Sequence, residues 1–162
     1  MFEQNPIRFR KAELKDAEIL AEYRVKFLNE LYPGKAESQQ AELKSELTSY
    51  FKDSLAENTL VAWLAEIDDE VISTSTLVIW KAPMSYSGLH KSGKRGYILN
   101  MYTITMYRKK GIAGMLLDKL IEEAKNLGLE YVHLHATNDG IEIYRKRGFK
   151  EPHFPELKLE IK

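Results

Sequence analysis

A basic, glycine-containing run between a predicted strand and a predicted helix constrains the fold of this chain more than any other segment. Residues 108–114 read Arg-Lys-Lys-Gly-Ile-Ala-Gly. They follow a β-branched, apolar segment over 97–106 and open a helical repeat of apolar residues over 111–127. The first N–H groups of a helix are unpaired and partly positive, and glycines let a phosphate approach them closely. The run therefore predicts a strand-loop-helix unit that binds an anion.

Two common phosphate-binding patterns do not fit this run. No Gly-Lys-Ser or Gly-Lys-Thr follows it, and the glycine spacing is not the Gly-x-Gly-x-x-Gly of dinucleotide folds. When the run is considered alone, there is an alternative interpretation. The helix then simply begins at a glycine, and the basic side chains are solvated.

Hydrophobic periodicity predicts an α/β chain around this unit, in the order β-α-α-β-β-β-α-β-α-β. Asp16 is expected to cap the first helix, Ser38 to cap the second, and Gly128 to end the helix over 111–127. The predicted strands cover 7–10, 59–66, 71–80, 97–106, 130–136 and 157–161, and the predicted helices cover 16–31, 38–56, 111–127 and 139–147. The long segment 81–94 is either a binding loop or a surface excursion.

Length and composition favour one globular domain over residues 1–162. Hydrophobic residues make up 44% of the chain and charged residues 30%, and no uncharged apolar run reaches the length of a membrane span, about 20 residues. The first ten residues lack the apolar core of a secretory signal. Because the chain has no cysteine, it has neither disulfides nor thiolate catalysis, and a cytoplasmic location is expected.

Charge is balanced overall but segregated along the chain. Lys+Arg and Asp+Glu each number 24, so the positive excess expected of a nucleic-acid binder is missing. Residues 37–70 hold nine carboxylates against Lys44 and Lys52, whereas residues 71–117 hold none. This pattern predicts either solvated faces and loops, or a cationic ligand near the first third of the chain and an anionic ligand near the middle.

The sequence resembles the acetyl-CoA-dependent GNAT N-acetyltransferases, and the resemblance covers nearly the whole chain. Residues 108–113 fit the Arg/Gln-x-x-Gly-x-Gly/Ala loop of that family, residues 137–149 fit its asparagine, tyrosine and Gly-Phe pattern, and residues 7–16 look like its opening strand and cap. The resemblance implies a mixed, mostly antiparallel central sheet with a splayed centre. It also implies acetyl-CoA as the co-substrate, with no metal.

By this resemblance, three neighbouring segments would hold the co-substrate. The backbone at the helix start would bind the CoA pyrophosphate: Gly111, Ile112, Ala113 and Gly114. Basic side chains just before it would add positive charge: Arg108, Lys109 and Lys110. The strand before the loop, which is bulged in the family, would line the pantetheine arm: Met101, Tyr102 and Thr103. A backbone N–H freed by the bulge would polarise the thioester carbonyl.

The resemblance also assigns roles after the next strand. Asn138 would touch the pantetheine arm, and Tyr144 would protonate the departing CoA thiolate as a general acid. The alternative for Tyr144 is an ordinary core tyrosine. The sequence departs from the family at Thr105 and Met106, where a proline and an acid are common.

A general base is not apparent in the sequence. Residues 97–106 lack the carboxylate that some relatives carry on the central strand. The remaining candidates are Glu66, His133, His135 or a chain of waters, and either histidine can equally be a structural strand residue.

The predicted function is direct transfer of an acetyl group to a primary amine of a small cationic molecule or a peptide, since the acidic segment 37–70 suits a cationic acceptor. A catalytically silent acyl-CoA sensor is the main alternative. Nucleic-acid binding through the basic segments 91–95 and 145–147 is disfavoured by the balanced charge, and no membrane partner is expected. The alternating residues 157–161 also suit pairing of two copies, so a homodimer is open.

Overall fold

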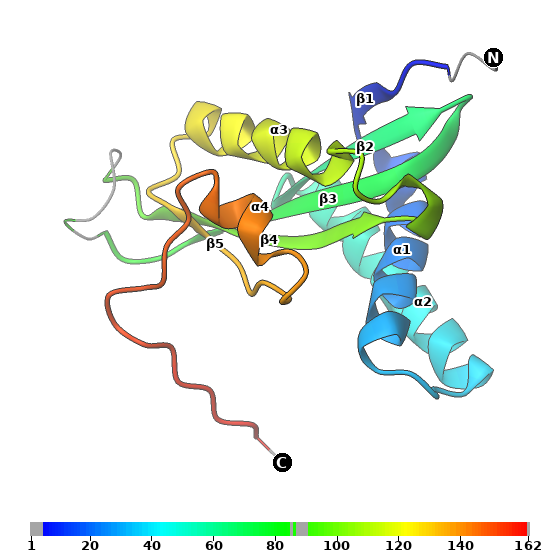
Figure 1. Ribbon diagram of the computed structural model, residues 1–162. Helices are drawn as coiled ribbons and strands as arrows, with labels where there is room; N and C mark the ends of the chain where they lie inside the picture. The colour runs from blue at the N-terminus through cyan, green and yellow to red at the C-terminus, as the bar shows by residue number, and fades with distance from the viewer. Residues whose placement is uncertain (1–4, 85, 87–90, 162) are drawn as a thin grey trace.

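The computed structural model describes residues 5–84, 86 and 91–161. Its centre is one five-stranded sheet in the order β1-β2-β3-β4-β5 (Figure 1). The strands β1 to β4 pair antiparallel in chain order, and β5 pairs parallel to β4. The strands are β1 (Arg8–Lys11), β2 (Leu60–Ile67), β3 (Glu70–Lys81), β4 (Lys94–Thr103) and β5 (Val132–His133). The predicted mixed, mostly antiparallel sheet is confirmed.

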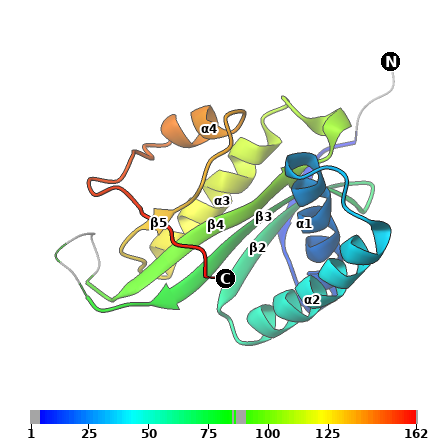
Figure 2. The same cartoon turned by 90° about the horizontal axis from the view of Figure 1, so that it is seen from below.

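Helices cover both faces of this sheet (Figure 2). The helices α1 (Ala17–Leu31) and α2 (Glu37–Ala56) lie on one face, where Leu20 is fully buried. The helix α3 (Ile112–Asn126) and the short α4 (Ile141–Arg145) lie on the other, where Leu117 is fully buried. None of the helices in the described ranges is long and apolar enough to cross a membrane.

Both ends of α3 follow the local sequence signals. Gly111 immediately precedes the helix in the left-handed region, with φ of 80°. At the other end Gly128 has φ of 66°, and the N–H of Leu129 donates to the carbonyl of Ala124. Because glycine adopts positive φ without a steric penalty, the predicted helix end at Gly128 is confirmed.

The two predicted side-chain caps are wrong. Asp16 closes a 3₁₀ turn (Leu14–Asp16) by accepting the Glu13 N–H, and it makes no cap bond to α1. Ser38 lies inside α2, which begins at Glu37. The N-cap residue is Ala36, whose own N–H donates to the side chain of Gln39, and no described side chain makes a cap bond to the first turn of α2.

A β-bulge interrupts β4 where it pairs with β3. Thr74 pairs with Tyr102 but Thr76 pairs with Leu99, so two residues of β4, Asn100 and Met101, oppose Ser75 alone. Asn100 has φ of 55°, in the left-handed region. Such a bulge takes backbone groups out of the regular ladder.

The sheet also opens between β4 and β5. The two strands pair only at Gly96 with Val132 and at Tyr97 with His133. A Cβ on Gly96 would come within 3 Å of side chains of Leu77, Leu129 and Val132, so only glycine fits where the strands meet. Beyond Tyr97 the strands diverge, which is the splayed centre predicted from the family.

The C-terminal third is less regular than predicted. The strand expected over 130–136 is only Val132–His133, and the helix expected over 139–147 is only Ile141–Arg145. The strand expected over 97–106 ends at Thr103, before a 3₁₀ turn (Thr105–Tyr107). The strand expected over 157–161 is wrong, since no strand is assigned there and its apolar side chains are at least 82% exposed. Alternating apolar and charged residues do not form a strand unless the edge of a sheet is available for them to pair with.

The segment 81–94 is partly described. Residues 85 and 87–90, in the middle of the predicted loop, lie outside the described residues. At its base the N–H of Ala82 donates to the carbonyl of Gly93, and the Gly93 N–H donates to the buried carboxylate of Glu130. These bonds fix the base of the loop to the connection between α3 and β5.

Candidate active site

The N-terminus of α3 is open. Among the described residues, no side chain caps its first N–H groups, and no atom lies within 4 Å of where a Gly111 Cβ would be. Lys109 and Lys110 are exposed just before it. The helix is 15 residues long, so its partial positive charge is fully developed at this end. The geometry therefore suits a phosphate or diphosphate.

Gly114 has a second role that sequence reasoning missed. A Cβ there would lie 2.7 Å from the guanidinium of Arg147. Arg147 binds Asp118 of α3 at 2.6 and 2.9 Å and donates to the carbonyl of Ile143 at 3.2 Å. Gly114 thus makes room for the link between α4 and α3. No local pattern pairs residues 118 and 147, so the sequence carried no signal for this contact.

Arg108 is engaged with protein rather than directed at the α3 N-terminus. Its guanidinium binds both carboxylate oxygens of Glu30 at 2.7 and 2.9 Å and donates to the carbonyl of Thr103 at 2.8 Å. The Tyr102 hydroxyl donates to the same carboxylate at 2.8 Å. The hydrogen bond from Arg108 lowers the pKa of Glu30. Arg108 therefore joins the end of α1 to the end of β4.

The three predicted pantetheine residues point in different directions. Met101 packs with α3 on the second face of the sheet. Tyr102 lies on the first face, where its ring meets Tyr23 of α1 edge to face at 5.6 Å. The buried Thr103 hydroxyl bonds Ser73 at 2.7 Å. Met101 packs in the core cluster of α3, whereas the side chains of Tyr102 and Thr103 are engaged by other partners, and all three can offer their backbone.

Asn100 is a position on this strand whose structural role sequence reasoning missed. Its side chain is 1% exposed and donates to the carbonyl of Leu20 in α1 at 3.1 Å. Its own carbonyl accepts from the Thr74 hydroxyl at 2.9 Å. These two bonds hold the bulge in place from both sides. Asparagine tolerates the left-handed region, which is the only local signal of its role.

Tyr144 lies on α4 in a largely apolar setting. Its ring meets Phe149 edge to face at 5.8 Å and joins the same core cluster as Met101. Burial raises the pKa of Tyr144 to about 12. Asn138 lies in the exposed turn before α4, where the Thr137 carbonyl accepts the N–H groups of Gly140 and Ile141. A neutral tyrosine hydroxyl is therefore present beside the splayed strands.

The Acetyltransferase (GNAT) family profile matches residues 20–149 of the chain. The chain belongs to the GNAT acetyltransferase family. A predicted acetyltransferase from Clostridium acetobutylicum, solved with acetyl-CoA, is 34% identical to it, with a TM-score of 0.81 over 94% of this chain and 96% of that one. Acetyl-CoA is accordingly the co-substrate of this GNAT acetyltransferase.

Two further acetyltransferases are similar to this chain. A GCN5-related N-acetyltransferase from Ralstonia eutropha JMP134 shares the fold, with 23% identity and a TM-score of 0.80 over 95% of this chain and 99% of that one. An N-alpha-acetyltransferase from Sulfurisphaera tokodaii is 28% identical over 109 residues, which are 63% of this chain. That match spans 64% of the archaeal protein, slightly less than two thirds of its length.

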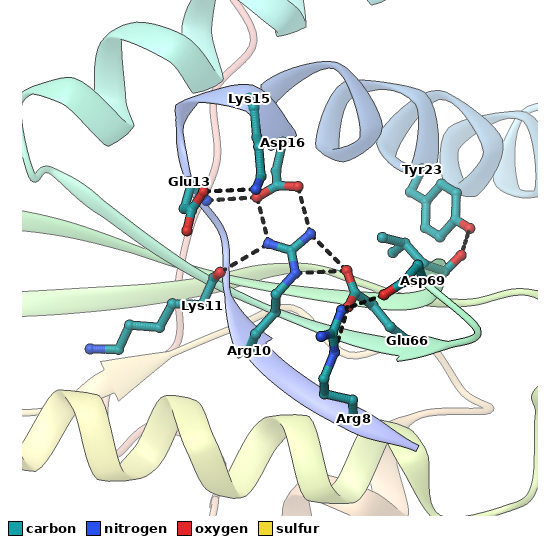
Figure 3. A network of polar contacts seen from close by, with 10 residues as sticks. Arg8, Arg10, Lys11, Glu13, Lys15, Asp16, Tyr23, Glu66 and Asp69 are labelled. Atoms are coloured by element: carbon teal, nitrogen blue, oxygen red, sulfur yellow. Dashed lines mark hydrogen bonds and ion pairs between the residues drawn. The ribbon is translucent and has the colours of Figure 1, made fainter. Parts of the chain in front are cut away.

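Glu66, one candidate base of this GNAT acetyltransferase, is part of a structural network (Figure 3). Its carboxylate is 2% exposed and binds Arg8 at 2.6 Å and Arg10 at 2.7 Å. Arg10 also binds both carboxylate oxygens of Asp16, at 2.7 and 2.8 Å. Burial alone would raise the pKa of Asp16, but hydrogen bonds from Arg10 and the Glu13 N–H hold it below its ordinary value. A carboxylate bound to two guanidiniums is not available to accept a proton from substrate.

The two candidate histidines differ in their surroundings. His133 packs among Trp80, Tyr97 and Tyr131, and burial lowers its pKa. Its Nδ1 is buried and has no hydrogen-bond partner among the described residues. His135 is exposed and is hydrogen-bonded on both ring nitrogens.

Replacing Glu66 by glutamine tests the structural role. Glu66→Gln should lower the free energy of unfolding by about 3 kcal/mol, because it leaves two guanidiniums without their shared buried anion. Asp69→Asn is the matched control, since Asp69 binds the same Arg8 at 2.8 Å but is 88% exposed, and it should cost less than about 1 kcal/mol. Urea denaturation at pH 7 measures both.

The pH dependence of that network follows from Asp16. Because the pKa of Asp16 is depressed in the folded state, its contribution to the free energy of unfolding is present above the unfolded pKa, near ~4, and is lost as pH falls through the folded pKa.

Equal destabilisation by Glu66→Gln and Asp69→Asn would contradict the structural role of Glu66, as would selective loss of turnover in a fully stable Glu66→Gln protein.

Proposed function

We propose that this GNAT acetyltransferase moves the acetyl group of acetyl-CoA directly to a primary amine of a small cationic molecule or a peptide. The observation that carries the proposal is that Met101 of the bulge and the half-buried Tyr144 pack on one core cluster beside α3, whose N-terminus is open. The chain has no cysteine to hold the acyl group, which favours a ternary complex over a covalent intermediate.

Each part of the site has a distinct task in this proposal. The first-turn N–H groups of α3, with Lys109 and Lys110, bind the CoA diphosphate. The bulge at Asn100 and Met101 presents a backbone N–H to the thioester oxygen, on which charge develops during attack. Acetyl-CoA supplies the activated acyl group. Asn138 would contact the pantetheine arm from the turn before α4.

Tyr144 is suited to be the general acid. With a pKa of about 12 its hydroxyl keeps its proton at neutral pH, so it can donate that proton to the departing thiolate. The largely apolar surroundings that raise this pKa also limit competing protonation by water.

Tyr144→Phe should reduce kcat about 10²-fold or more and leave the KM for acetyl-CoA within about threefold, because only the acid is removed. A thiol-release assay measures this against polyamines, aminoglycosides, amino acids and short peptides. Tyr131→Phe, which removes a hydroxyl from an exposed tyrosine, is the control and should keep full activity. Tight acetyl-CoA binding without turnover of any amine would favour the acyl-CoA sensor instead.

The cationic nature of the acceptor rests on charge around the start of α1. An open cleft of about 580 Å³ lies there, next to the connection between β2 and β3. Six carboxylates and three basic side chains line it. Five of these carboxylates are ion-paired, including Asp69 with Arg8, whereas Glu70 has no ion pair among the described residues. The unpaired carboxylate of Glu70, beside the exposed Asp69, favours a cationic group of the acceptor.

The double substitution Asp69→Asn with Glu70→Gln should raise the KM for the acceptor several-fold, because it removes two negative charges from this cleft. The KM for acetyl-CoA, which binds elsewhere, should stay unchanged. The best amine of the panel is the substrate, and steady-state kinetics at two ionic strengths measure the effect. An unchanged acceptor KM would defeat the assignment of a cationic acceptor to this cleft.

A further inference from the structure

Three side chains from distant segments form a hydrogen-bonded chain where β4 and β5 diverge. The Tyr97 hydroxyl and Nδ1 of His135 are 2.9 Å apart, and Nε2 of His135 lies 3.2 Å from a carboxylate oxygen of Glu156. Tyr97 is on β4, His135 follows β5, and Glu156 belongs to the C-terminal segment. Tyr97 is also in the last residue pair before the strands separate.

We propose that this chain removes the proton of the acceptor ammonium, with Tyr97 as the relay and His135 as the proton acceptor. Glu156 is a positioning residue that acts through His135. The proposal rests on the proposed function, because it supplies the general base that direct acetyl transfer to an amine requires.

The hydrogen-bonding groups are arranged for this direction of transfer. The Glu156 carboxylate can only accept, so Nε2 of His135 carries the proton and Nδ1 is left with a free lone pair. The Tyr97 O–H then donates to Nδ1, and its oxygen lone pairs face away from the imidazole. Those lone pairs can accept a proton from an ammonium while the hydroxyl proton passes to His135.

The location also fits the proposed acyl-transfer site. Tyr97 precedes the bulge at Asn100 by three residues on the same strand, which corresponds to about 10 Å of strand. The phenol side chain and one bridging water cover such a distance. Among the other candidates, Glu66 is held by Arg8 and Arg10, and Nδ1 of His133 is enclosed by aromatic rings.

His135 has an exit for the proton. Its side chain is 62% exposed and lines an open cleft of about 880 Å³ along β5. The titratable groups nearest to it are Tyr97 from β4, His133 from β5 and Glu156, and the charged Arg24 of α1 interacts with Tyr97 from the helix side. Further along the cleft lie the other ionisable lining residues: Tyr131, Tyr144, Arg145, Lys150, Glu151 and Lys158.

The protons balance over one turnover. The ammonium gives one proton through Tyr97 to His135, and the imidazolium later releases it to solvent. The neutral amine forms the C–N bond and the C–S bond breaks. Tyr144 protonates the thiolate and recovers the second proton of the amine, so the products are the amide, CoA thiol and one proton in solution.

Two nearly isosteric amines separate base catalysis from structural effects. Ethylamine is protonated at pH 7, whereas 2,2,2-trifluoroethylamine is mostly neutral and needs no base. His135→Gln should lower kcat/KM for ethylamine about 10²-fold and leave that for trifluoroethylamine within about threefold.

The pH profile of the same variant is a further test. In His135→Gln, the rise of kcat/KM with pH that reports imidazole deprotonation should disappear. His133→Gln, two residues earlier at the end of β5, should keep both the ratio and the pH profile. Equal loss for the two amines, or a pH profile that follows His133, would overturn the proposal.

A second readout does not depend on turnover. The ¹⁵N resonance of His135 Nε2 should move in Glu156→Gln, because its carboxylate acceptor is replaced. The resonance of Nδ1 should move in Tyr97→Phe, because the hydroxyl that donates to it is removed. If neither variant moves its resonance, the chain does not exist in solution. Absence of turnover of both amines by the unchanged protein, with both resonance shifts present, would instead count against the acceptor class of the proposed function.

Discussion

The bulge on β4 is the constraint on which the rest of the site depends. Asn100 holds a left-handed conformation because its amide binds the Leu20 carbonyl of α1 and its own carbonyl accepts from Thr74. A buried asparagine with these partners couples the position of α1 to the course of the central strand. Tyr97, three residues before the bulge, makes the last pair with β5, and beyond it the two strands diverge, so the bulge lies in the part of β4 that has no pair on this side.

Charge in this GNAT acetyltransferase is divided between structural and functional tasks. Arg8, Arg10 and Arg108 are held by carboxylates and tie together β1, β2, α1 and the segment before α3. Lys109 and Lys110 have no ion pair among the described residues and stay beside the α3 N-terminus. Guanidiniums suit fixed bidentate contacts, whereas a lysine ammonium is a mobile point charge. The distribution explains how a chain with no net charge keeps two unpaired ammonium groups at this helix end.

Features set by neighbouring residues could be predicted from the sequence, and features set by distant contacts could not. Gly111 and Gly128 mark the ends of α3 because positive φ is a local requirement, and the family pattern gave the splayed sheet. The bonds of Asn100 and the room that Gly114 leaves for Arg147 depend on elements far apart in the chain. Residues 157–161 alternate apolar and charged side chains but are not assigned to a strand, because a strand also needs a neighbouring strand with which to pair.

Amide chemical shifts on addition of CoA test the central claim, that the α3 N-terminus binds the diphosphate beside the bulged strand. In ¹⁵N-labelled protein, CoA should move the amide resonances of residues 111–114 strongly, and pantetheine, which lacks the diphosphate, should leave them in place while shifting those of residues 101–103. Strong CoA binding with the resonances of residues 111–114 unmoved would contradict the account.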